Sequence, residues 1–238
     1  MKLALSLFLC GAALAARASS QSLPTADEVV SRMIERESQR QAALHNYSGF
    51  RRYILENERH HKRAEMLVRI NCLDDGSKEF DTVSASGWGG ARRHVFPRLL
   101  ESEREASLPG NRNRSRITPD NYSFQMIGEE MAAGRAAYVL AIAPKTENKY
   151  LIRGKVWVDA DEYAIVRIEG EPAKNPSFWI KNIHFVHTYQ KNGPLWLPAS
   201  DRSITDARIF GPTEVTIDYF SYVTKMPMLS RSQYGSNN

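Results

Sequence analysis

Cysteine is scarce in this sequence: the 238 residues include only Cys10 and Cys72. Cys10 lies in an apolar N-terminal run that we expect to be removed on export, which leaves Cys72 alone. An intramolecular disulfide is therefore excluded in the mature chain, and so is the class of small secreted domains held together by disulfides. We interpret Cys72 as a small buried apolar residue rather than a reactive thiol.

The motifs of several enzyme classes are also missing. There is no H-E-x-x-H, no C-x-x-C and no G-x-S-x-G, so the usual signatures of zinc peptidases, redox pairs and serine hydrolases are absent. The loop 87–90 (Gly-Trp-Gly-Gly) does not match a dinucleotide fingerprint. His184 and His187 fall on a predicted strand, where residues three apart point to opposite faces and do not share a metal. We expect no metal and no cofactor.

Clustered carboxylates are the remaining hint of catalysis. Asp159, Asp161 and Glu162 lie together, but at a predicted hairpin turn, where Asp is favoured for local hydrogen bonding. We interpret them as turn residues and expect no enzymatic activity. A hydrolase with two carboxylates facing each other across a cleft stays open as an alternative.

Only one long apolar run is present, and it lies at the N-terminus. Lys2, the run from Leu3 to Ala16 and the small residues of Ala16-Arg17-Ala18 are typical of a secretory signal peptide cleaved after Ala18. We therefore predict a signal peptide over 1–18, one domain over 19–224 and a disordered tail over 225–238, with the mature protein in the periplasm. The formal charge of +5 falls to +3 once Lys2 and Arg17 are removed, and we expect no nucleic-acid partner for an exported chain of so mild a charge.

Two helices are predicted. Thr25 and Glu28 form a capping-box pattern at the start of an amphipathic helix over 26–45. A second helix over about 93–105 has Phe96 and Leu99 at helical spacing and Pro97 near its start, where proline is tolerated. The segment 107–116 is rich in Pro, Asn, Arg and Ser, and we interpret it as a mobile loop.

The rest of the chain alternates with a period of two. Extended segments are predicted at 48–57, 64–71, 79–84, 135–143, 152–159, 164–169, 178–190, 200–210 and 213–222, and turns such as Asp74-Asp75-Gly76 and Asn192-Gly193-Pro194 separate them. Short turns between sequential strands imply antiparallel pairing, and about ten such strands twist too strongly to stay flat. The predicted fold class is mainly β: an open, strongly curved antiparallel half-barrel, with the N-terminal helix and a lid helix over its concave face.

Apolar residues on both faces of several strands indicate a cavity as well as a core. We expect the following large side chains to line an apolar ligand cavity: Tyr53, Phe96, Leu99, Trp157, Phe178, Trp179, Phe185 and Trp196.

Several stretches resemble a known family. They are 149–159 (KYLIRGKVWVD), 167–172 (RIEGEP), 175–179 (NPSFW) and 195–200 (LWLPAS), with 51–53 (RRY) and 118–122 (TPDNY) in addition. These are similar to outer-membrane lipoprotein-sorting proteins of the LolA/RseB-like superfamily, and the likeness covers most of the mature chain. The resemblance implies an open β-barrel whose helices close an apolar cavity for acyl chains.

The resemblance also implies an arginine that closes the lid. The carrier's own pattern, Arg-Pro followed by aromatic-x-Trp, is absent here, so Arg51, Arg52 and Arg69 are all candidates for that role. We expect a monomeric periplasmic carrier of lipoprotein acyl chains or another lipid, with membrane proteins as possible partners. The alternatives are an envelope sensor that docks on a membrane protein and, third, the secreted hydrolase.

Overall fold

Helix α1 (Ala26–Ala43) begins where the capping box predicts. The Glu28 backbone N–H donates to Thr25 Oγ1 at 3.3 Å, and the Thr25 N–H donates to the Glu28 carboxylate at 2.8 Å. Both bonds satisfy backbone donors that the first helical turn leaves free.

The computed structural model describes residues 23–44, 46–174, 180–207 and 211–225. The predicted signal peptide lies outside these residues.

Ten strands follow α1 and form one antiparallel sheet. They are β1 (Asn46–Asn57), β2 (Lys62–Cys72), β3 (Lys78–Gly87), β4 (Tyr122–Ala132), β5 (Arg135–Pro144), β6 (Ile152–Asp159), β7 (Ile165–Pro172), β8 (Ile180–Asn192), β9 (Leu195–Ala207) and β10 (Gly211–Lys225). Their order is β3-β2-β1-β10-β9-β8-β7-β6-β5-β4, so β1 pairs with the last strand. Because β3 and β4 are the two edges and do not pair with each other, the sheet stays open.

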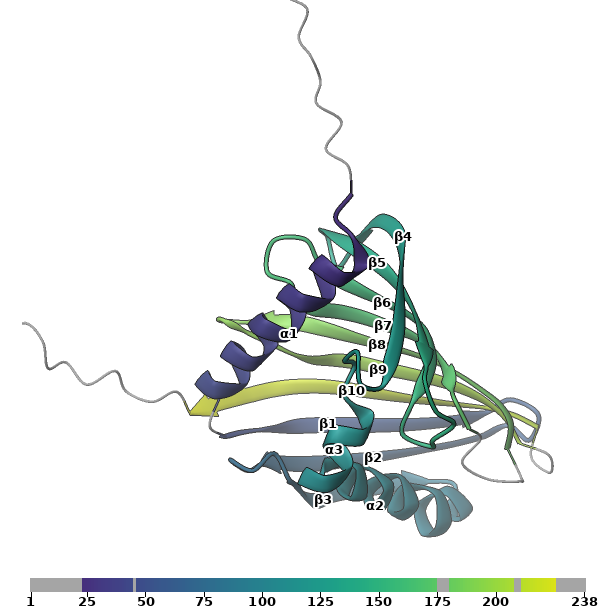
Figure 1. Cartoon of the computed structure of the whole chain (residues 1–238). Helices are drawn as coiled ribbons and strands as arrows, with labels where there is room; N and C mark the ends of the chain where they lie inside the picture. The colour runs from purple at the N-terminus through teal and green to yellow at the C-terminus, as the bar shows by residue number, and fades with distance from the viewer. Residues whose placement is uncertain (1–22, 45, 175–179, 208–210, 226–238) are drawn as a thin grey trace, which may run out of the picture.

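The sheet is curved, and the helices lie on its concave side (Figure 1). Helix α1 crosses the strands of the upper half, whereas a π-helical turn (Ala91–Val95), α2 (Phe96–Ser107) and α3 (Pro109–Ser115) lie by β1, β2 and β3. The predicted half-barrel with an N-terminal helix and a lid helix is confirmed. None of the described helices has an apolar stretch long enough to cross a membrane.

The buried apolar residues form three clusters. The α1 cluster joins Val29, Val30 and Met33 of α1 to residues of β4, β5, β6, β7 and β8. The α2 cluster joins Phe96 of α2 to β1 and β2. Cross-strand pairing places both clusters on the concave face, while a small outer cluster around Trp157 lies on the opposite face.

Two segments differ from the sequence-based expectation. The predicted loop at 107–116 contains the helix α3, because Pro109 lies in its first turn, where its missing N–H costs nothing, and Ser115 Oγ donates to the Arg112 carbonyl at 3.0 Å. Strand β4 was not predicted; Tyr122, Phe124 and Met126 alternate with polar residues in its first half, but a register shift between Met126 and Gly128 moves the second half to the other face. The predicted tail begins at Lys225, the last described residue, and otherwise lies outside the described residues.

Candidate functional site

The α2 cluster is an apolar floor covered by one helix. Its floor consists of Tyr53 and Leu55 from β1 and of Ala64, Met66 and Val68 from β2, all nearly inaccessible to solvent. Helix α2 covers it with Phe96, and with the half-buried Leu99 and Leu100. The rings of Tyr53 and Phe96 lie 6.5 Å apart. Tyr53, Phe96 and Leu99, which the sequence proposes as cavity residues, therefore lie together.

A second space, lined by both apolar and polar side chains, lies beside α1. A pocket of about 300 Å³ opens between α1, the segment 115–118 and the strands β7 to β9. Its walls include Met33 and Ile34 of α1, Ile165 and Ile168 of β7, and Tyr189 of β8. Trp196 also lines it. This volume is at the lower end of the range for small-molecule sites.

A row of polar side chains, which we call the belt, lies on the concave face between the α2 cluster and the α1 cluster, and it includes Glu103 of α2. Arg51 of β1 forms an ion pair with Glu103 through Nη1. Lys78 Nζ of β3 donates to Glu103 Oε1 at 2.9 Å, and the Tyr53 hydroxyl donates to Oε2 at 3.2 Å. We call Arg51, Tyr53, Lys78 and Glu103 the Glu103 cluster. It joins α2 to the sheet by charge.

The charges in this cluster are strongly coupled. Burial alone would raise the pKa of Glu103, but Lys78 and Arg51 outweigh it and lower that pKa from 4.5 to about 2. Burial opposes the charge of Arg51, yet Glu103, with Tyr219 and Tyr53, raises its pKa above the usual value. Both groups therefore stay ionised at neutral pH. Removal of one partner from a buried ion pair of this kind is strongly destabilising.

The belt continues across the sheet. The guanidinium of Arg51 lies 4.6 Å from the centre of the Tyr219 ring of β10. The Tyr219 hydroxyl donates to Asp201 Oδ2 of β9, and Asp201 Oδ1 contacts His187 Nδ1 of β8. Burial and the charge of Asp201 raise the pKa of Tyr219, so the hydroxyl keeps its proton. Polar contacts thus link four adjacent strands to the lid helix.

The other aromatic candidates are distributed between the two faces. Phe185 lies in the α1 cluster. Trp157 points to the opposite face, because its neighbours Val156 and Val158 point into the α1 cluster and side chains alternate along a strand. Trp157 therefore lies away from the concave face. Phe178 and Trp179 lie outside the described residues.

The three candidate arginines do not share a face either. Arg51 points to the concave side, but Arg52 and Arg69 point to the outer side. There Arg52 lies over the Phe220 ring at 5.7 Å, and Arg69 lies over the Phe50 ring at 5.5 Å. The structure thus leaves Arg51 as the one of the three that contacts α2. Adjacent strand residues point to opposite faces, so only one of Arg51 and Arg52 could contact α2, and the sequence did not show which one.

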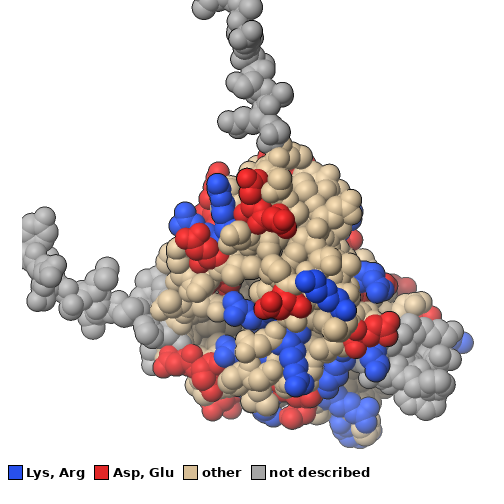
Figure 2. Space-filling view, viewed as in Figure 1, with Lys and Arg blue, Asp and Glu red and all other residues tan. Residues whose placement is uncertain are grey.

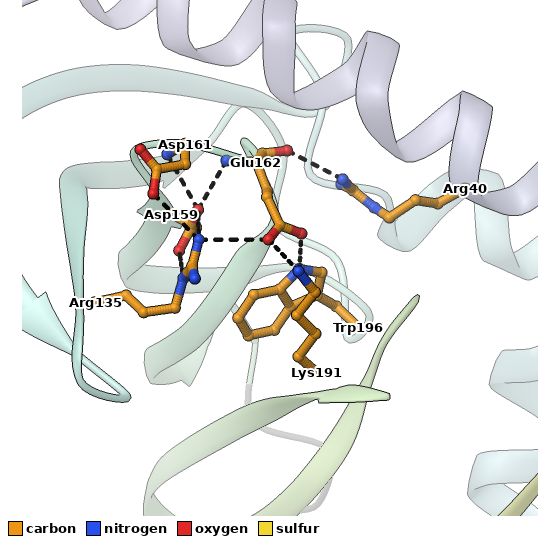
Figure 3. A network of polar contacts seen from close by, with 7 residues as sticks. All are labelled: Arg40, Arg135, Asp159, Asp161, Glu162, Lys191 and Trp196. Atoms are coloured by element: carbon orange, nitrogen blue, oxygen red, sulfur yellow. Dashed lines mark hydrogen bonds and ion pairs between the residues drawn. The ribbon is translucent and has the colours of Figure 1, made fainter. Parts of the chain in front are cut away.

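The carboxylates at 159–162 form a structural network (Figure 3). Asp159 is buried, pairs with Arg135, and accepts the backbone N–H groups of Asp161 and Glu162 at 3.1 and 2.7 Å. Glu162 accepts from Lys191 at 2.5 Å and from the Trp196 indole at 2.9 Å. All three side chains are occupied in the turn between β6 and β7, as the turn interpretation expects.

This network also fixes the end of α1. Arg40 Nη1 donates to the Glu162 carbonyl at 3.1 Å (Figure 3). Arg40 Nη2 donates to the Tyr163 carbonyl at 3.3 Å. The N-terminal helix is therefore bound to the β6–β7 turn through backbone acceptors. Those acceptors carry no titratable charge, so this attachment does not depend on the ionisation of a carboxylate.

Sequence reasoning missed Glu103, Lys78 and Tyr219. Glu103 carried a usable signal: it follows Phe96, Leu99 and Leu100 at helical spacing, so it occupies an apolar position of the helix that faces the sheet. A carboxylate at such a position requires a buried cation opposite. Lys78 and Tyr219 carried no comparable signal, because their contacts depend on strand pairing.

The structure is thus an open, curved antiparallel sheet with two apolar regions on its concave face, each covered by a helix, and polar side chains between them. Residues 62–170, which span β2 to β7, match the model of the MucB/RseB N-terminal domain family. The resemblance to the LolA/RseB-like superfamily that the sequence indicates is thus confirmed. No curated protein sequence matches the chain.

Solved structures with a similar fold have low sequence identity to this chain. A putative outer-membrane lipoprotein-sorting protein domain from Vibrio parahaemolyticus is 11% identical, with a TM-score of 0.44 over 84% of this chain and 93% of that one. A LolA superfamily protein from Nitrosomonas europaea is 11% identical, with a TM-score of 0.38 over 86% and 96%. The MucA/MucB complex structure from Pseudomonas aeruginosa is 12% identical, with a TM-score of 0.27 over 85% and 99%.

Proposed function

We propose that this protein binds and carries an acylated or otherwise apolar ligand in the periplasm, with the ligand held against the concave face of the sheet. The observation that carries the proposal is the α2 cluster, an apolar floor covered by one helix rather than by a second sheet layer. Burial of an acyl chain contributes about 0.8 kcal/mol per methylene, so such a floor can hold a chain without specific polar contacts. The proposal requires no metal and no covalent step.

Helix α2 is the element that we propose to move. Its apolar contact is made by few side chains, and its charged contact through Glu103 is reversible. Displacement of Phe96 and Leu99 would uncover Tyr53, Leu55 and Met66 for a ligand chain. The pocket beside α1 is a second place where part of the chain can lie.

A second candidate function is that of an envelope sensor that docks on a membrane protein. The family match favours it, because the family is that of MucB and RseB, and MucB has been crystallised in complex with MucA(peri). A sensor of this kind would form a stable complex with its partner whether or not lipid is bound. A carrier would not. Pull-down from solubilised membranes with lipid-loaded and lipid-free protein separates the two.

The primary test is native mass spectrometry of the mature protein purified from its own host, followed by lipid extraction. We expect one acylated species per chain, which would also identify the ligand class. A ligand-free mass, together with no binding of a fluorescent fatty acid, would contradict the carrier proposal. Hydrolysis of the extracted ligand by the wild-type protein, but not by an Asp159→Asn variant, would instead favour the hydrolase.

A further inference from the structure

The Glu103 cluster resembles an anion-binding site in which the bound anion is the Glu103 carboxylate of the lid helix α2. The three groups that donate to the carboxylate, Arg51, Lys78 and Tyr53, all belong to the sheet. The carboxylate alone belongs to α2. If α2 moves away, the donors remain in place and the anion leaves with the helix. The sheet therefore carries a preformed site for one negative charge beside the apolar floor.

One donor of this site is unused. The Nε of Arg51 is buried and has no hydrogen-bond partner among the described residues. The guanidinium lies near two aromatic rings, with the Tyr219 centre at 4.6 Å and the Phe80 centre at 5.6 Å. Buried polar atoms are rarely left without a partner, so this donor requires an explanation. An anion that presents more oxygens, or presents them at a different angle, than Glu103 does can engage it.

The site can be reached from solvent. The Arg51 side chain is only 2% exposed, but those of Lys78 and Glu103 are 25% and 23% exposed. An anionic group can therefore approach from the Lys78 side while the arginine stays covered. Basic and acidic side chains are interspersed on this face over α2 and α3 (Figure 2), so the attraction of an anion comes from the donors of the Glu103 cluster themselves.

Lid opening has an electrostatic cost that depends on the ligand. A neutral apolar ligand that displaces α2 removes Glu103 and leaves the charge of Arg51 without a partner on a largely buried surface, which is strongly unfavourable. A ligand with its own negative charge restores the pair. Because Arg51 and Tyr53 lie next to each other on one face of β1, a head group at Arg51 places its attached chain over the α2 cluster.

We infer that the ligand is an amphiphile with a single anionic head group, a carboxylate or a phosphate, which takes the place of Glu103 on Arg51, Lys78 and Tyr53. Glu103 is then an internal competitor that keeps α2 closed until such a ligand arrives. This inference rests on the proposed function and names the ligand class for the same site. Arg51 is the residue that makes the site prefer an anionic ligand to a neutral one.

The test compares a fatty acid with the fatty alcohol of the same chain length, by displacement of a fluorescent fatty-acid probe. For the wild-type protein we expect the acid to bind about tenfold or more tightly than the alcohol, the effect of a charge-assisted hydrogen bond. The Glu103→Gln variant removes the competitor, so both ligands bind more tightly and their ratio is kept. The Arg51→Met variant should lower the ratio several-fold, since only Lys78 and Tyr53 then remain as donors.

Two further variants guard against misfolding. Arg52→Met changes the adjacent arginine, which points to the outer face, and must leave both affinities unchanged. If Arg51→Met does not fold, Lys78→Gln removes a partly exposed donor and should lower the acid-to-alcohol ratio several-fold. An alkyl phosphate should compete as the acid does.

Three outcomes would overturn the inference. The wild-type protein could bind acid and alcohol equally well. The acid-to-alcohol ratio could stay unchanged in Arg51→Met or Lys78→Gln, or Glu103→Gln could fail to bind the acid more tightly than the wild-type protein does. Competition by acetate or inorganic phosphate as strong as that of the amphiphiles would reduce the site to a simple anion site. By contrast, failure of both acid and alcohol to bind would contradict the proposed function itself.

Discussion

The two helix-covered halves of the concave face are held together by different forces. Under α1, Val29, Val30 and Met33 are at most 3% exposed and pack into the larger apolar cluster, and Arg40 adds hydrogen bonds to backbone carbonyls. Under α2, the apolar contact is smaller and an ion pair with Glu103 completes it. Helix α1 is therefore part of the core. Helix α2 is held by an ion pair that a charged ligand can replace and that a low pH can weaken.

The largest effect is expected from a cavity in the α1 cluster. Leu140 of β5 is fully buried there, so Leu140→Ala should lower the free energy of unfolding by about 2–5 kcal/mol. Urea denaturation followed by circular dichroism measures the change. The matched control is Ile127→Ala on the neighbouring strand, where a 48% exposed side chain should contribute no more than about 0.5 kcal/mol. Equal effects of the two changes would show that the α1 half is not the core.

The next effect should be confined to the α2 half. Arg51→Ala leaves Glu103 with Lys78 as its only cation, and should destabilise the closed helix by about 2–3 kcal/mol, less than for a fully buried pair because Glu103 is partly exposed. Hydrogen exchange should speed up for the amides of α2 and stay unchanged for those of α1. Arg52→Ala, on the outer face, serves as the control. Faster exchange in both helices would mean that the two halves open together.

A smaller effect is expected from pH. Because the pKa of Glu103 is lowered from 4.5 to about 2, its contribution to stability is fully present above 4.5 and is lost as the pH falls towards 2. The loss is smaller than in Arg51→Ala, since a protonated carboxyl can still form hydrogen bonds. Protection of α2 should therefore decline between pH 5 and about 2. In Glu103→Gln this decline in protection should vanish. If it remained, the pH dependence would come from a group other than Glu103.

The smallest effect concerns the start of α1. Thr25→Ala removes the side-chain half of the capping box and should cost about 1 kcal/mol. Thermal unfolding should detect the loss, and Thr25→Ser, which keeps the hydroxyl, should restore most of it. An unchanged midpoint in Thr25→Ala would mean that packing of Val29 and Met33 alone fixes where the helix begins.

Much of the fold was predictable because its signals are local. The capping box at Thr25 and Glu28 and the turns at 74–76 and 192–194 indicated α1 and the hairpins correctly. Strand β4 was missed where a bulge at 126–128 breaks the alternation, and α3 was missed because its composition is that of a loop. In both cases neighbours in the fold, rather than the local pattern, decide the structure.

The candidate site was less accessible to sequence reasoning. The sequence proposed Tyr53, Phe96 and Leu99 as residues that line a ligand cavity, and the structure brings the three together in the α2 cluster. The sequence offered three arginines for one role, and it offered no partner for any of them. The partner, Glu103, lies 52 residues from Arg51. Only the packing of α2 on β1 places the two side chains in contact.

The sequence by itself determined the alternation of the strands and the amphipathic helices, because side-chain periodicity follows directly from local backbone geometry. It also determined that Arg51 and Arg52 must point to opposite faces. The tertiary structure alone decided which of those faces is concave, since the direction in which the sheet curves depends on all ten strands and on the helices packed against it. That decision buries Arg51 against Glu103 and leaves Arg52 on the outer surface.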